Sequence, residues 1–193
     1  NLKMQGAKID VWGVGTKLIT AYDQPALGAV YKLVSIADEN GQMVDTMKIS
    51  SNAEKVSTPG KKQVWRITRK RDGKSEGDYI ALWEEQPDQE SELYMFHPVF
   101  TYINKTITEF EARPILQDII VEGKLVYELP SLQEVKAFSE AQMSGLWDEY
   151  KRILNPEDYP VDLSQKTYDH KMATIKEIKK QIKEEASLLE STK

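Results

Sequence analysis

The sequence predicts an α+β fold in which a mostly antiparallel β region is followed by two C-terminal helices. Two observations support this prediction. Short apolar runs separated by glycine turns fill residues 28–128, and amphipathic runs with a helical period fill residues 129–193. Before both, residues 1–27 contain a short apolar segment that ends in a glycine turn. We therefore divide the chain into these three regions.

The first predicted element is a strand over residues 9–12 that leads into a Gly-x-Gly-Thr turn at Gly13, Gly15 and Thr16. Such a turn exposes backbone N–H groups, and the Thr16 hydroxyl adds a donor, which together suit a phosphate. Many turns of this kind hold no ligand. A strand followed by a phosphate-binding turn is typical of the last strands of a (β/α) barrel. Residues 1–27 are therefore expected to form the end of such a barrel.

The second region is predicted from alternating apolar and polar residues bounded by turn residues. Turns are predicted at residues 38–41, 71–74 and 122–123. The predicted strands cover residues 30–36, 46–49, 63–68, 78–82, 92–96, 108–112, 117–121 and 124–127. Strands of this length and spacing predict a small sandwich or an open sheet.

The third region is predicted to hold two helices. Ser131 and Glu134 have the spacing of a capping box, which starts a helix, and the pair Asn155-Pro156 is expected to end it. A second helix is expected to start near Ser164. Its apolar face comprises Tyr168, Met172, Ile175, Ile178, Ile182 and Leu189.

The composition excludes several kinds of site and partner. The chain has no cysteine, so it forms no disulfide, thiolate nucleophile or zinc ribbon. The net charge is −5 with both signs interspersed, which argues against a nucleic-acid partner. The basic residues between 61 and 74 are interpreted as the solvated face and turn of a hairpin. No apolar run is long enough to span a bilayer, so no membrane partner is expected.

No catalytic residue and no metal ligand is predicted in this chain. His97 is interpreted as a surface histidine or a hydrogen-bonded core histidine, and His170 as facing solvent. The adjacent Glu84 and Glu85 are interpreted as a solvated turn, with a cation site as the alternative. Trp12 is expected either to pack in a core or to form one wall of a ligand site.

Several segments, taken in order, carry a resemblance to a known family. They are residues 10–16 (Asp-Val-Trp-Gly-Val-Gly-Thr), 24–28 (Gln-Pro-Ala-Leu-Gly), 30–34, 59–64 and 129–132. Together they resemble the C-terminal part of nicotinate phosphoribosyltransferases, which are type II phosphoribosyltransferases. Members of this family are considerably longer than 193 residues. We therefore expect this chain to be the C-terminal part of a longer enzyme.

The resemblance implies an ATP-dependent enzyme of cytoplasmic NAD salvage, and enzymes related to this family often work as homodimers. Such an enzyme forms nicotinate mononucleotide from nicotinate and phosphoribosyl pyrophosphate, with Mg²⁺ assisting the pyrophosphate. Gly13, Gly15 and Thr16 match the family's loop for the ribose 5-phosphate. The family's phosphorylated histidine lies upstream, and neither His97 nor His170 matches it, so this part is expected to be inactive without the rest of the parent chain. The alternative is a non-catalytic β-plus-helix module for interaction or scaffolding.

Overall fold

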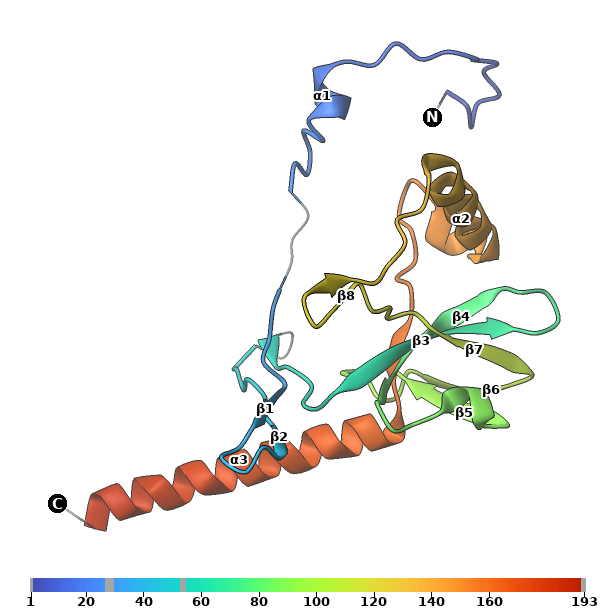
Figure 1. Ribbon diagram of the computed structural model, residues 1–193. Coiled ribbons are helices and arrows are strands. Elements are labelled where there is room, and N and C mark those ends of the chain that lie inside the picture. The colour runs from blue at the N-terminus through green and yellow to red at the C-terminus, as the bar shows by residue number, and fades with distance from the viewer. Residues whose placement is uncertain (1, 27–29, 53–54, 192–193) are drawn as a thin grey trace. The chain divides into compact units, whose positions relative to one another are not determined.

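The computed structural model describes residues 2–26, 30–52 and 55–191, and the chain divides into two units, Asn1–Lys32 and Leu33–Lys193 (Figure 1). The predicted boundary between residues 27 and 28 lies outside the described residues. The same holds for Gly28 of the 24–28 segment and for the side chain of Leu189.

The first unit contains one short helix, α1 (Thr16–Ile19), among turns and irregular chain. The predicted strand at residues 9–12 is wrong, because these residues form no strand in the described part of the unit. A strand needs a neighbour to pair its N–H and C=O groups, and the described residues of this unit provide none. Trp12 is 48% exposed, so it is not a core residue of this unit. The expected last strand of a barrel is therefore not observed.

The second unit is built on a six-stranded sheet, which confirms the α+β class and the mostly antiparallel pairing. The strands follow the order β6-β5-β10-β4-β3-β7, and only β4 and β10 run parallel. Their bounds are β3 Lys62–Arg69, β4 Ser75–Leu82, β5 Glu92–Phe96, β6 Asn104–Thr108, β7 Phe110–Pro114 and β10 Val161–Leu163.

The sheet curls, because its two edge strands are consecutive in the chain. β6 and β7 lie at opposite ends of the strand order, yet Glu109 alone separates them (Figure 1). Glu109 has a φ of 51°, which turns the chain sharply at this corner. The prediction of one strand over residues 108–112 is therefore wrong, since the corner divides that segment between two strands.

Strand β10 was not predicted. Its three residues lie between β4 and β5, parallel to the first and antiparallel to the second. The predicted helix start directly after it is confirmed. Helix α3 (Gln165–Ser191) follows Ser164, whose Oγ accepts a hydrogen bond from the N–H of Thr167 at 3.0 Å.

Two small hairpins form separate two-stranded sheets, one before β3 in the sequence and the other between β7 and β10. β1 (Ser35–Ala37) and β2 (Met43–Asp45) confirm the turn at residues 38–41, where Gly41 has a φ of 79°. The first strand is shorter than predicted. The return strand predicted over residues 46–49 is wrong, because the Asp38 N–H closes the turn on the Gln42 carbonyl and β2 ends at Asp45, before that segment. β8 (Ile120–Val121) and β9 (Lys124–Leu125) confirm the turn at 122–123 but are shorter than predicted.

Helix α2 (Leu132–Gly145) starts at the predicted capping box. The Ser131 N–H donates to Glu134 Oε2 at 2.7 Å, and the Glu134 N–H donates to Ser131 Oγ at 3.3 Å. Its predicted end at Asn155 is wrong. The helix stops ten residues earlier because Lys74 Nζ donates to the carbonyls of Ser144 and Leu146 at 3.0 and 3.1 Å. Two 3₁₀ turns complete the described elements, η2 (Pro87–Gln89) and η3 (Asp148–Lys151).

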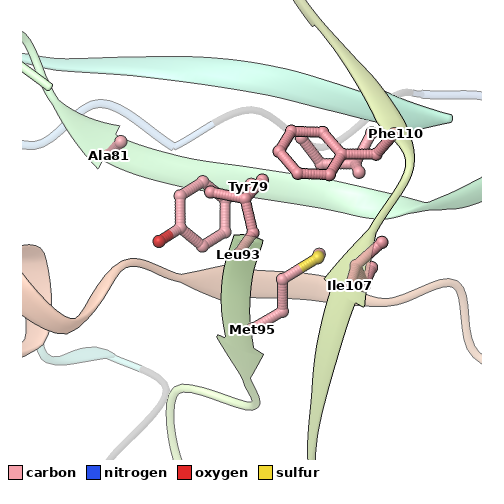
Figure 2. Close-up of a cluster of buried hydrophobic side chains, with 7 residues drawn as sticks. Tyr79, Ala81, Leu93, Met95, Ile107 and Phe110 are labelled. Carbon is pink, nitrogen blue, oxygen red and sulfur yellow. The ribbon is translucent and has the colours of Figure 1, made fainter. Parts of the chain in front are cut away.

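The core of the second unit is a cluster of buried side chains from the five strands β3, β4, β5, β6 and β7. Its members are Ile67, Tyr79, Ala81, Leu93, Met95, Ile107 and Phe110 (Figure 2). Trp65 and Ala112 pack against it. By contrast, no residue of α2 is buried.

We expect Gly77→Ala to destabilise the second unit by about 2–4 kcal/mol. Gly77 has a φ of 136°, and a Cβ there would lie 2.9 Å from the carbonyl oxygen of Pro160, just before β10. The free energy of unfolding in urea measures the loss. Gly123→Ala is the control, because its φ of 76° brings strain while its Cβ would meet nothing within 4 Å. Equal losses in the two variants would contradict the role of this close contact.

Candidate functional site

The predicted phosphate-binding residues lie together at the start of α1. Gly15 is the N-cap of this helix and Thr16 its first residue. A Cβ added at Gly13 or Gly15 would meet nothing within 4 Å. Neither glycine has a positive φ, so the backbone conformation does not require glycine at these positions. What the missing side chains provide here is room for close approach to the main chain.

The donors of this loop are free. Among the described residues, neither the N–H groups of residues 13–17 nor the Thr16 hydroxyl has a hydrogen-bond acceptor. The Thr16 carbonyl, by contrast, accepts bonds from the N–H and the hydroxyl of Thr20 at 2.9 and 2.8 Å. The loop is thus able to offer several donors to an anion, and its role in binding phosphate stays a prediction.

A second candidate site lies in the other unit, between α2 and the strands β3 and β7. An open groove of about 630 Å³ is found there, and a cavity of about 150 Å³ adjoins it. Arg66, Arg113 and Gln142 line both. Gln142 Oε1 accepts hydrogen bonds from Arg66 Nη1 at 3.1 Å and from Arg113 Nη2 at 3.2 Å. These three side chains come from β3, β7 and α2, so no short sequence motif predicts that they meet.

Arg66 is anchored by a carboxylate on the neighbouring strand. Its Nε and Nη2 donate to Asp78 Oδ1 and Oδ2 at 2.9 and 3.1 Å, a bidentate pair, and the hydroxyl of Tyr159 donates to Asp78 Oδ1 at 3.1 Å. The hydrogen bond to Asp78 raises the pKa of Arg66, and burial raises the pKa of the Tyr159 hydroxyl. At neutral pH the site therefore holds a charged guanidinium and a neutral phenol.

The interpretation of the basic segment as a solvated face is correct for the exposed Lys70 and Arg71. It is wrong for four other residues, one of which is Lys74, whose Nζ donates to two carbonyls at the end of α2. Arg66 is paired as described above. Arg69 pairs with Asp72 and Glu76 at 2.6 and 3.2 Å and lies over the ring of Trp147. Lys62 donates to the carbonyls of residues 58–60, and burial lowers its pKa. The contacts of Arg66 with Asp78 and of Arg69 with Trp147 join residues that are distant in the sequence, so a local pattern does not show them.

The predictions for the two histidines differ in their outcome: the one for His97 is confirmed and the one for His170 is not. His97 Nδ1 accepts from the N–H groups of Val99 and Phe100 at 3.1 and 2.9 Å, which confirms it as a hydrogen-bonded histidine. The prediction that His170 faces solvent is wrong. Its Nε2 lies 2.8 Å from Asp45 Oδ2, and about two thirds of each of these side chains is covered.

The solvated turn predicted at Glu84 and Glu85 holds only for Glu84, which is exposed. Glu85 Oε1 accepts hydrogen bonds from the Leu82 N–H at 2.7 Å and from Ser164 Oγ at 2.6 Å. Glu85 thus helps to fix the start of α3. The described residues contain no group of three or more His, Cys, Asp or Glu side chains placed to hold a metal ion. No helix among them is long and apolar enough to cross a membrane.

Residues 61–171 match the family described as "Nicotinate phosphoribosyltransferase C-terminal domain". The chain belongs to the nicotinate phosphoribosyltransferase family. The resemblance noted in the sequence is thereby confirmed. The matched region contains the Arg66, Arg113 and Gln142 site, whereas the glycine loop at residues 13–16 lies before it.

Individual relatives agree with this assignment. The chain is 57% identical over 185 residues to nicotinate phosphoribosyltransferase of Bacillus subtilis, covering 96% of this chain and 38% of that protein. It is 32% identical over 165 residues to the human nicotinate phosphoribosyltransferase, covering 86% of this chain and 30% of the relative. The crystal structure of human nicotinic acid phosphoribosyltransferase aligns with a TM-score of 0.54 and 27% identity over 63% of this chain and 23% of that one. The chain thus spans well under half the length of these relatives.

We expect Asp78→Asn to lower the stability of the family's C-terminal domain by about 2–4 kcal/mol, because it leaves the partly buried Arg66 without its counter-charge. Urea unfolding followed by circular dichroism measures the change. Asp72→Asn is the control, since Asp72 pairs with Arg69 in an exposed turn and its loss costs less. A midpoint for Asp78→Asn equal to that of the control would refute the anchoring role.

Proposed function

We propose that this chain is the C-terminal part of an enzyme that forms nicotinate mononucleotide and pyrophosphate from nicotinate and phosphoribosyl pyrophosphate. The observation that carries the proposal is the 57% identity to the Bacillus subtilis nicotinate phosphoribosyltransferase over 96% of the chain. This similarity favours an enzyme over the alternative of a non-catalytic scaffold module. The parent enzyme would serve NAD salvage in the cytoplasm, driven by ATP hydrolysis, and would act as a homodimer.

In this proposal the glycine loop holds the ribose 5-phosphate. The free N–H groups around Gly13 and Gly15 and the hydroxyl of Thr16 donate to the phosphate oxygens, which backbone donors hold without a cation. The reaction develops positive charge on the ribose as pyrophosphate leaves. Fixing the 5-phosphate positions the anomeric carbon for attack by nicotinate, and such positioning lowers the barrier by removing motional freedom beforehand.

The other requirements of the reaction are assigned to the rest of the parent chain. No group of described side chains fits a Mg²⁺ ion, so no step in this chain is routed through the metal. His97 and His170 are engaged in their own contacts with Val99, Phe100 and Asp45, so neither is proposed as the phosphorylated histidine. We therefore propose that this part supplies phosphate positioning and is inactive without the rest of the enzyme.

We expect Thr16→Val in the complete enzyme to raise the KM for phosphoribosyl pyrophosphate about tenfold, the effect of losing one hydrogen bond to a charged group. The KM for nicotinate should not change, because the proposed contact is with the phosphate alone. Steady-state kinetics with each substrate varied in turn measures both constants.

Thr20→Val is the matched control for this experiment. Thr20 lies one turn further along, and its hydroxyl donates to the Thr16 carbonyl, so it is not available to the phosphate. Its KM for phosphoribosyl pyrophosphate should equal that of the unmodified enzyme. An unchanged KM in Thr16→Val would remove the phosphate contact from the proposal.

A further inference from the structure

The turn between β1 and β2 contains the one asparagine of the chain that is followed by glycine, Asn40-Gly41. Both residues are exposed, and the side-chain amide of Asn40 forms no hydrogen bond with any residue that the structure describes. A Cβ added at Gly41 would meet nothing within 4 Å. The carboxamide of Asn40 is therefore open to attack by the main-chain nitrogen of Gly41, with no side chain in the way.

This arrangement favours a reaction of asparagine that needs no enzyme. The Gly41 nitrogen attacks Cγ of Asn40, a C–N bond forms, and the amino group of the carboxamide leaves as ammonia with the proton taken from Gly41. The product is a cyclic succinimide, which one water molecule then opens at either of its carbonyls. Opening gives aspartate or isoaspartate at position 40, so the reaction consumes one water and releases one ammonia.

Asp38 restrains the attacking nitrogen and the N–H groups on both sides of it. The Gly41 N–H donates to the Asp38 carbonyl at 3.0 Å, and the N–H groups of Asn40 and Gln42 donate to Asp38 Oδ1 at 2.9 and 2.8 Å. Ring formation requires the turn to open, because the Gly41 nitrogen must leave its acceptor. A hairpin of two three-residue strands is only marginally stable, so such opening is frequent.

The aspartate of the Asp72-Gly73 turn could form the same ring, but its side chain is held in place. Arg69 Nε and Nη2 donate to the two carboxylate oxygens of Asp72 at 3.2 and 2.6 Å, and the Lys74 N–H donates to Oδ1 at 3.1 Å. The Gly73 N–H donates to the Arg69 carbonyl at 2.8 Å. An ionised carboxylate held in this way is a poor target for a nucleophile, so Asn40 is the more reactive of the two positions.

A change at Asn40 would weaken the hairpin. Aspartate adds a carboxylate beside those of Asp38 and Glu39, and like charges at this spacing repel. Isoaspartate adds a methylene to the main chain, which displaces the N–H groups that follow it from their acceptor. The return strand β2 ends at Asp45, whose Oδ2 lies 2.8 Å from His170 Nε2 on α3, so a looser hairpin also weakens this contact.

We propose that Asn40 is a site of spontaneous deamidation, that the hydrogen bonds to Asp38 limit its rate, and that the products loosen the β1–β2 hairpin. Aged copies of the protein would then differ from new ones in this hairpin. The proposal does not rest on the function of the glycine loop.

The reaction is measured by incubating the complete protein at mildly alkaline pH and mapping its peptides by mass spectrometry. The peptide that contains Asn40 should gain the mass of an NH₂ to OH exchange sooner than the peptides that contain Asn52 or Asn104. Asn40→Gln should abolish the change in this peptide, because glutamine would have to close a larger ring.

The restraint by Asp38 is tested by Asp38→Ala, which removes the acceptor of two N–H groups. Deamidation of Asn40 should become about fivefold faster, the effect of losing one net hydrogen bond. Glu39→Ala is the matched control, since Glu39 has the same charge in the same exposed turn and no side-chain hydrogen bond with any described residue. Its rate should equal that of the unmodified protein, and circular dichroism should show both variants folded.

The loosened hairpin is measured by hydrogen–deuterium exchange of residues 35–45 before and after ageing. Exchange should become faster in the aged protein and stay unchanged in aged Asn40→Gln.

Three outcomes would overturn the proposal. They are an Asn40 peptide that reacts no faster than those of Asn52 and Asn104, an equal acceleration in Asp38→Ala and Glu39→Ala or none in either, and exchange in residues 35–45 that ageing does not change. No outcome depends on turnover, so failure here is distinguishable from failure of the phosphate-loop assignment.

Discussion

The position of β10 is the constraint on which the second unit depends. Its three residues fill the space between β4 and β5, and without them the strand order would be divided into two separate pieces. The chain reaches this position through Pro160, whose carbonyl accepts a bond from the Asp78 N–H at 3.0 Å, and only a glycine at position 77 leaves room for that approach. Directly after β10, Ser164 starts α3 and bonds Glu85. One short strand therefore fixes both the continuity of the sheet and the origin of the last helix.

Polar contacts, and not burial of apolar side chains, connect α2 to the sheet. The helix has no buried residue. Arg66 donates a hydrogen bond to the side chain of Gln142, and Lys74 donates hydrogen bonds to two carbonyls at the helix end. The Trp147 indole N–H adds a bond to the Ser75 carbonyl at 2.8 Å. Directional bonds of this kind define where the helix ends and how it is oriented. They also leave its apolar side chains exposed along the groove.

Local patterns in the sequence were sufficient for some elements and not for others. Period-two alternation between turn residues identified β3 and β5, and the capping box located the start of α2. β10 escaped prediction because three residues are too few to show a period, and the end of α2 depends on Lys74, which is remote in sequence. The strand expected at residues 9–12 has no pairing partner among the residues of its unit that the structure describes.

The candidate sites divide in the same way. The glycine loop is contiguous, so the sequence alone could single it out, and its ligand is still a prediction. The groove residues Arg66, Arg113 and Gln142 are separated along the chain and meet only in the folded unit. His170 was expected to face solvent for the same reason, because Asp45, which it contacts, is far from it in the sequence. Functional residues that are adjacent in the sequence could be predicted, whereas residues that meet only in the folded unit could not.

The late position of β10 in the chain has a consequence during protein synthesis. While the ribosome is still adding residues up to 160, β4 and β5 have already been made, but each has one edge without its partner. Unpaired strand edges are templates for association with other chains. Nascent copies of this domain would therefore pass through an interval of aggregation risk, in which a chaperone that shields β-strand edges would be most valuable, and the interval would close once Val161–Leu163 emerge.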